Sequence, residues 1–357
     1  MSKRNLIIIV LVLGVIAVVT QYVTSHKNSP TDEKVGQPLV KTDIIGSVDE
    51  LVIKESKHEI HLNKQSGQWL IKEKENFPVD IKKLRDLFDN LTTYQVSSLV
   101  TKNPHRLAHF KVLYLSEKYD KSKSTGIQLI LKDKGKEIYT LVAGKSRSTA
   151  SKKDKSMKVS DGTYVRIGYE PLVYLIKENL KFDSSPDFWI SKTLIRLEKS
   201  NIKAIRINLS DEKYAFVKSD QKSDLLLSDQ HTEEQLKKQE LSNIVEDLES
   251  FEFEELFRRS KKHDRLLELK SEILVEMDDL STFEFQILTE TKAAPLDDEK
   301  EDKEVNYFVK VLDPAGKTIK ENNKALYRNS KKWLFKMNDW QAKKWLKKRA
   351  DYIESKN

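Results

Sequence analysis

Short strand-like segments followed by one amphipathic helix open the polar part of the chain. The strand-like segments are rich in aliphatic residues, are separated by turn residues, and lie at residues 48–55, 59–63 and 68–72. A Phe-Pro-Val-Asp sequence at residues 77–80 then precedes apolar residues that recur every three or four positions, at Leu84, Leu87, Phe88 and Leu91. This spacing places the apolar side chains on one face of a helix. The pattern therefore predicts a three-stranded meander followed by one amphipathic helix.

The same order of patterns returns in the second half of the chain. Strand-like segments lie at residues 202–209, 214–218 and 225–227, and a second helical stripe consists of Leu241, Ile244, Val245, Leu248 and Phe251. Residues of the second stripe lie 157 positions after those of the first, as Leu84 and Leu241 illustrate. We interpret this agreement as an internal duplication. The predicted fold class is α+β, in which two similar units each combine an antiparallel sheet with one packed helix.

The duplication predicts where the units begin and end. The first unit is placed at residues 42–192, the second at residues 193–350, and a tail at residues 351–357. Each unit continues with a predicted hairpin, at residues 127–131 with 137–142 and at residues 273–277 with 283–288. Residues 164–166 are then matched with residues 326–328, and residues 305–312 are interpreted as an extra strand of the second unit.

An uncharged apolar run precedes both units. It covers residues 6–23. The residues assigned to the membrane anchor are Leu6, Ile7, Ile8, Ile9, Val10, Leu11, Val12, Leu13, Gly14, Val15, Ile16, Ala17, Val18 and Val19. A helix of this length is about 27 Å long, which approaches the hydrocarbon thickness of a bilayer. We therefore predict a single transmembrane helix that anchors the protein, with residues 24–41 as a polar linker.

Charges beside the anchor predict its orientation. Lys3 and Arg4 precede the apolar run, whereas Thr24 and Ser25 follow it. The positive-inside rule then places residues 1–5 in the cytoplasm and the large remainder outside it. The expected location is the inner membrane of a bacterium, with the two units in the periplasm. A cleaved signal peptide is the alternative, and it also exports the two units.

Composition narrows the classes of chemistry. The chain has no cysteine, which excludes disulfides, thiolate metal sites and cysteine nucleophiles. Its formal net charge of +8 comes from 64 basic and 56 acidic residues that are spread over the chain. Nucleic-acid binding needs a concentrated basic stripe, so nucleic acid is not expected as a partner.

Catalytic and cofactor motifs are absent from the sequence. The phosphate-binding patterns Gly-x-x-x-x-Gly-Lys and Gly-x-Gly-x-x-Gly do not occur, nor does the Gly-x-Ser-x-Gly pattern of hydrolases. His105 and His109 have the spacing of a helical metal-binding pair, but no glutamate follows the first histidine. We interpret them as ordinary residues of a short helix. The sequence therefore predicts no enzyme, no cofactor and no metal site.

Two arginines and two tryptophans are candidates for contacts. Arg166 and Arg328 occupy matching positions in the two predicted units and are expected on strands. Each is a candidate for an ion pair within its unit, or for contact with an anion or a partner. Trp340 and Trp345 lie among lysines and are expected to pack into the core of the second unit. The alternative for this segment is contact with an anionic membrane surface.

Several segments, taken in order, resemble one bacterial family. They are Trp-Leu-Ile at residues 69–71, Pro-Val-Asp at 78–80, Asn-Pro at 103–104, Tyr-Val-Arg at 164–166, Val-Tyr-Leu at 173–175 and Asp-Phe-Trp-Ile at 187–190. With the N-terminal span, they resemble the family called domain of unknown function 4340. The resemblance implies a membrane-anchored extracytoplasmic protein that accompanies an uncharacterised ABC transport or gliding-motility-like system. It offers no catalytic motif to transfer.

These inferences lead to one expected function and two alternatives. The expected protein is a non-catalytic, membrane-tethered periplasmic module that assists an ABC-type transport or envelope assembly. Its expected partners are the membrane itself and proteins such as an ABC permease and its ATPase. One alternative is an exported hydrolase with a site between the two units. The other is a binder of an anionic envelope polymer or lipid.

Overall fold

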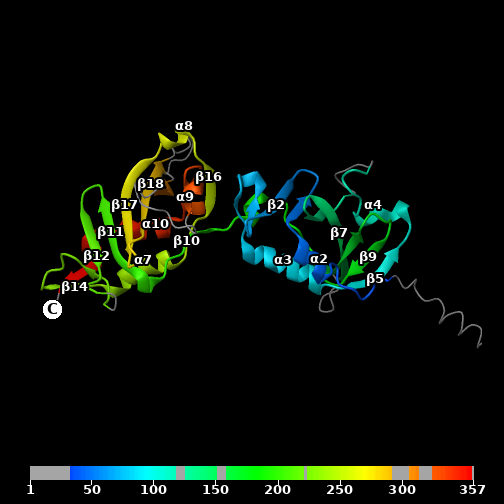
Figure 1. Cartoon of the computed structure of the whole chain (residues 1–357), viewed down its shortest axis with the longest axis horizontal. Helices are drawn as coiled ribbons and strands as arrows, with labels where there is room; N and C mark the ends of the chain where they lie inside the picture. Colours follow the sequence, from blue (N-terminus) through cyan, green and yellow to red (C-terminus); the bar gives the residue numbers. More distant parts are fainter. Residues whose placement is uncertain are drawn as a thin grey trace, which may run out of the picture. The chain divides into compact units, whose positions relative to one another are not determined.

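The computed structural model describes residues 33–117, 125–150, 158–220, 223–291, 305–312 and 324–355. The chain divides into two compact units between Ile190 and Ser191, two residues before the predicted boundary (Figure 1). We call them unit 1 and unit 2. Both contain antiparallel sheets and a few helices, which confirms the predicted α+β class.

Unit 1 is built on a sheet of nine strands in the order β4-β3-β2-β1-β6-β7-β8-β9-β5. The strands are β1 (Glu50–Lys54), β2 (Glu59–Gln65), β3 (Gln68–Ile71), β4 (Phe77–Pro78), β5 (Val96–Thr101), β6 (Ile127–Asp133), β7 (Lys136–Ala150), β8 (Lys158–Ile167) and β9 (Val173–Ile176). The helical elements are α2 (Thr42–Ser47), η1 (Lys72–Lys74), α3 (Ile81–Thr93), η2 (Pro104–Arg106), α4 (Leu107–Phe110) and α6 (Pro186–Trp189). The predicted meander corresponds to β1, β2 and β3.

Unit 2 is built on a sheet of eight strands in the order β13-β12-β11-β17-β18-β19-β20-β16. These strands are β11 (Ile202–Leu209), β12 (Lys213–Val217), β13 (Leu226–Leu227), β16 (Glu255–Arg258), β17 (Glu268–Met277), β18 (Thr282–Thr291), β19 (Val305–Leu312) and β20 (Trp333–Met337). Two small sheets pair β10 (Thr193–Ile195) with β15 (Phe251–Glu252), and β14 (Glu234–Leu236) with β21 (Ile353–Ser355). The helical elements are η3 (Lys199–Asn201), α7 (Lys238–Glu249), α8 (Lys261–Asp264), α9 (Lys324–Ser330), α10 (Asp339–Trp345) and η5 (Arg349–Tyr352).

The two main sheets share one strand order. In unit 1 the meander β3-β2-β1 is followed by β6, β7, β8, β9 and β5, and in unit 2 the meander β13-β12-β11 is followed by β17, β18, β19, β20 and β16. Helix α3 precedes β5 in the chain, just as α7 precedes β16. This common topology agrees with the duplication inferred from the sequence.

One predicted correspondence is wrong. Residues 326–328 do not form the counterpart of β8, because they lie in helix α9. The counterpart is β19, which the sequence pattern presented as an extra strand. β19 pairs with β18 from Glu284↔Leu312 to Thr291↔Val305 and also pairs with β20. Its mostly alternating burial fits this interior position in the sheet.

The two amphipathic helices confirm the predicted stripes. The side chain of Asp80 caps α3 by accepting hydrogen bonds from the backbone N–H groups of Lys82 and Lys83. The buried side chains of α3 are Leu84, Leu87 and Leu91, and those of α7 include Leu241, Ile244, Val245 and Leu248. These side chains anchor each helix in the core of its unit.

Among the described residues, no helix is long and apolar enough to cross a membrane. The predicted anchor at residues 6–23 lies outside the described residues.

Candidate functional site

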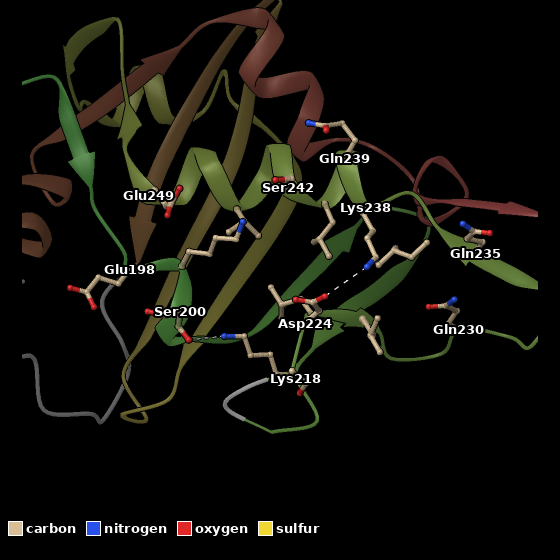
Figure 2. Close-up of a pocket in the computed structure, with 17 residues that line it drawn as sticks. Glu198, Ser200, Lys218, Asp224, Gln230, Gln235, Lys238, Gln239, Ser242 and Glu249 are labelled. Carbon is tan, nitrogen blue, oxygen red and sulfur yellow. Dashed lines mark hydrogen bonds and ion pairs between the residues drawn. The ribbon is translucent and has the colours of Figure 1, made fainter.

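A groove in unit 2 is the candidate functional site. It has a volume of about 1080 Å³ and is lined by residues of α7 and of the edge strand β13 (Figure 2). Residues of β14 and η3 complete its lining. All of the lining residues belong to unit 2, so this unit by itself contains the site. We call it the α7–β13 groove.

Aliphatic side chains from several elements line the groove. Leu225, Leu236, Leu241 and Val245 are buried, and they come from the β13 region, β14 and α7. Leu226 of β13 is different, because 49% of its surface is exposed. An exposed leucine beside a buried aliphatic lining offers apolar surface to a bound molecule. The groove therefore favours contact with apolar groups.

Charged side chains also belong to the lining. Three acidic residues, Glu198, Asp224 and Glu249, are matched by three basic residues, Lys199, Lys218 and Lys238. The Lys238 ammonium lies 3.8 Å from the Asp224 carboxylate, and both side chains are more than 80% exposed. Such exposed pairs contribute about 0–1 kcal/mol to stability. The charges of these described lining residues balance, so they do not favour an ion of either sign.

Hydrogen-bonding groups also face the groove. The side-chain amides of Gln230, Gln235 and Gln239 and the hydroxyl of Ser242 belong to its lining (Figure 2). The ammonium of Lys218 donates to the backbone carbonyl of Ser200 at 2.6 Å. The amide of Gln230 donates to the Glu234 carbonyl, that of Gln239 to the Asn243 side chain, and the Ser242 hydroxyl to Glu246. A ligand could therefore use only their remaining donor and acceptor atoms.

Arg349 holds one wall of the groove by ion pairs with Glu234 and Asp229, and we call this set of contacts the Arg349 clamp. The Arg349 guanidinium donates to both carboxylate oxygens of Glu234, at 3.0 and 2.8 Å. It also donates to the carboxylate and the backbone carbonyl of Asp229, at 2.9 Å each. In addition, β14 pairs with β21, with Leu236 opposite Ile353. The segment between β13 and α7 is thus held by the C-terminal segment.

The clamp has an electrostatic consequence. Hydrogen bonds from the Arg349 guanidinium, helped by the backbone N–H of His231, lower the pKa of Glu234 from its usual 4.5 to about 2. A carboxylate whose pKa is lowered by folding contributes stability above its unfolded pKa. This contribution is lost as the pH falls from about 4.5 to about 2.

Replacing Glu234 by glutamine is expected to destabilise unit 2 at pH 7 and to have almost no effect at pH 2. The variant lacks the carboxylate that pairs with Arg349, whereas at pH 2 much of that carboxylate is already protonated in the wild-type protein. Thermal unfolding of both proteins between pH 7 and pH 2 measures the difference. Glu233→Gln, at an exposed neighbouring position, is the control. A destabilisation of Glu234→Gln that does not change with pH would contradict the clamp.

Arg166 forms the ion pair that was one of its two predicted roles. It lies on β8, and its side chain is only 4% exposed. The guanidinium donates to both carboxylate oxygens of Glu117, at 3.1 Å each, and to the backbone carbonyls of Tyr169 and Glu170. It also lies 4.6 Å from the centre of the Tyr114 ring. These contacts all come from unit 1, while contact of Arg166 with an anion or a partner stays a prediction.

Arg328 has a different environment from the one expected. It lies in helix α9, not on a strand, and it is exposed. The structure therefore does not place the two arginines in corresponding positions. Neither Arg166 nor Arg328 lines the α7–β13 groove. Contact of Arg328 with a partner stays a prediction.

The other residues highlighted in the sequence are distributed over both units. His105 lies in η2 and His109 in α4, where the His109 ring lies 3.1 Å from the Lys145 ammonium. Trp345 is 1% exposed, as expected for the core, but Trp340 is 59% exposed, so the prediction was wrong for Trp340. Within the described ranges, no three histidine or acidic residues form a group that could hold a metal ion.

The groove itself was not predicted from the sequence. Its clamp joins Arg349 to Glu234, which is 115 residues away in the chain. In the sequence, Arg349 belongs to the basic run Lys347-Lys348-Arg349, which has the composition of a solvated surface. A signal was nevertheless available: Glu234 and Gln235 lie 157 positions after the apolar pair Phe77 and Pro78. A polar pair at that position indicates that the two units differ there.

Comparisons with known proteins give one match. The family described as "Domain of unknown function (DUF4340)" matches residues 69–271, which is more than half of the chain. No curated protein matches, and no solved structure matches. The matched range contains most of β3 and all of β4 to β9 in unit 1. In unit 2 it contains the meander β11-β12-β13, α7 and the complete lining of the α7–β13 groove. The chain therefore belongs to the DUF4340 family.

Proposed function

We propose that this protein is a non-catalytic binding module, tethered to the inner membrane of a bacterium with its two units in the periplasm. Residues 6–23 form the tether, and the α7–β13 groove holds a partner of an ABC-type transport or envelope assembly. The tether confines the module to the membrane plane and raises its effective concentration near an integral-membrane partner.

The observation that carries the proposal is the apolar patch in the groove, which is formed by Leu225, Leu226, Leu236, Leu241 and Val245. Binding sites are typically concave and largely apolar, with a few polar groups that orient the ligand. Hydrolysis would require an acid or base that converges on one reacting bond. The acidic residues of the lining, Glu198, Asp224 and Glu249, are instead exposed. This arrangement supports binding more than hydrolysis.

Deleting residues 6–23 is expected to move the protein from the membrane fraction to the soluble fraction. The full chain should stay in the membrane after washing with high salt and alkaline buffer, because a hydrophobic helix is not released by screening charges. After extraction with mild detergent, a C-terminal affinity tag should recover a permease and an ATPase together with the full chain. Quantitative mass spectrometry of the recovered proteins is the readout.

A control variant keeps the composition of residues 6–23 but scrambles their order. It should remain in the membrane, since hydrophobicity and length determine insertion. Two results would contradict the proposal. One is a mature protein whose N-terminus begins after residue 23 and which is freely soluble. The other is a membrane-bound full chain that recovers neither a permease nor an ATPase.

A further inference from the structure

Within the described residues, the edge strand β13 of unit 2 lacks a neighbour that its counterpart β3 in unit 1 possesses. In unit 1, β4 covers the outer edge of β3, with Phe77 opposite Ile71 and Pro78 opposite Leu70. The Phe77 side chain is only 4% exposed. In unit 2, β13 ends the main sheet of the described residues. The backbone N–H of Gln230 donates to the Leu227 carbonyl of β13, but no strand of the described residues other than β12 pairs with β13. An edge without a neighbouring strand can pair with a strand of another chain.

The segment that corresponds to β4 has moved away from the edge. β14 precedes helix α7 as β4 precedes α3, and Glu234 lies 157 positions after Phe77, the same spacing as between the helical stripes. β14 pairs with β21 instead of β13, and the Arg349 clamp holds Glu234. The α7–β13 groove, lined by Leu226 of β13 and Leu236 of β14, separates the two strands. The groove therefore occupies the place that corresponds to β4, the strand that covers the edge of the sheet in unit 1.

We propose that the α7–β13 groove accepts an extended, uncharged and apolar segment of a partner polypeptide as an added strand beside β13. This inference rests on the proposed binding function and names the class of partner. Added strands derive affinity from backbone hydrogen bonds and specificity from alternate side chains. Leu226, which is 49% exposed, and the aliphatic residues of the lining supply an apolar surface for such side chains. In unit 1 the buried Phe77 of β4 occupies the corresponding position. The described lining residues carry three charges of each sign, which complements a segment without net charge.

A capped synthetic octapeptide that alternates valine or phenylalanine with threonine is the probe. The full chain in detergent micelles is titrated with the peptide, and binding is measured by calorimetry up to about 1 mM, the weakest affinity worth assigning. Two further peptides carry N-methyl groups on alternate backbone amides, one on each edge of the strand. Methylation of one edge should abolish binding and methylation of the other should not, because an added strand uses only one of its edges.

Two groove variants test the location. Leu226→Lys is expected to weaken peptide binding at least about tenfold by placing a charge beside an uncharged strand, whereas Leu266→Lys, at an exposed leucine outside the groove, should not. Ser242→Trp fills the groove from α7 and should abolish binding, whereas Glu246→Trp on the same helix should not. Protection of amide hydrogens in α7 verifies that each variant is folded.

Several results would overturn the inference. They are the absence of peptide binding, equal binding of both N-methylated peptides, or binding that Ser242→Trp leaves unchanged. Binding of anionic phospholipid vesicles that Ser242→Trp blocks would assign the groove to lipid and also overturn it. Peptide binding needs only the groove, whereas recovery of a permease and an ATPase needs the anchor. A chain that recovers those proteins but ignores the peptide would refute the added strand and leave the tethered module standing.

Discussion

Replacing Arg166 by alanine is expected to lower the free energy of unfolding of unit 1 by about 3 kcal/mol, the lower end of the range for breaking a buried ion pair. The guanidinium is almost completely buried, and it satisfies the Glu117 carboxylate together with the carbonyls of Tyr169 and Glu170. Without it, the two carbonyls lose this donor and the Glu117 carboxylate keeps the backbone N–H of Tyr114 as a donor. The lower end applies because Glu117 is 34% exposed and can be hydrated in the variant.

Urea unfolding of the full chain in mild detergent, followed by hydrogen exchange of β8 and β9, measures the loss in unit 1. Arg328→Ala is the matched control, because that arginine is exposed and lies in unit 2. Its expected change in the free energy of unfolding is at most about 0.5 kcal/mol. Equal effects of the two substitutions would show that burial of the Arg166 ion pair does not stabilise unit 1.

Replacing Trp345 by alanine is expected to destabilise unit 2 by about 3–5 kcal/mol, as is typical for removing a buried tryptophan. The side chain is 1% exposed, and its ring lies 6.3 Å from the ring of Phe251, measured between centres. Helix α10, which ends at Trp345, contacts α7. The alanine variant would therefore leave a cavity near the helix that lines the groove.

Trp340→Ala is the control for Trp345→Ala. Trp340 is 59% exposed, and its ring contacts the Lys344 ammonium at 4.0 Å from the ring centre. The expected decrease in the free energy of unfolding is about 0.5–1 kcal/mol, the contribution of an exposed cation–π contact. Hydrogen exchange in β18 and β19 at increasing urea concentration reports the unfolding of unit 2. If Trp340→Ala were as destabilising as Trp345→Ala, burial would not explain the effect.

The duplication could be inferred from the sequence because both units repeat the same local spacing of hydrophobic residues. The stripe around Leu84 and the stripe around Leu241 both follow the helical repeat, and both bury against a sheet. Strands β11 and β17 were likewise recognisable from their aliphatic residues. The match failed at residues 326–328, where three residues are too few to distinguish a strand from a helix.

The environments of Arg166 and Arg328 could not be predicted from the sequence. Arg166 and Arg328 both follow a tyrosine, yet one is buried in an ion pair and the other is exposed on a helix. The partner of Arg166, Glu117, is 49 residues away in the chain. Periodicity predicts which face a residue occupies, but it does not predict which distant carboxylate lies opposite. The same reason hid the Arg349 clamp.

Hydrophobic spacing by itself determined the α+β class, the meanders, the two amphipathic helices and the approximate boundary between the units. These features depend on contacts between residues that are close in the sequence. The tertiary structure alone decided which edge is covered. Phe77 completes the sheet of unit 1, whereas the corresponding segment of unit 2 is held by β21 and Arg349. Pairing between distant segments therefore creates the groove at β13. The sequence indicates only, through Glu234 and Gln235, that the two units differ at this position.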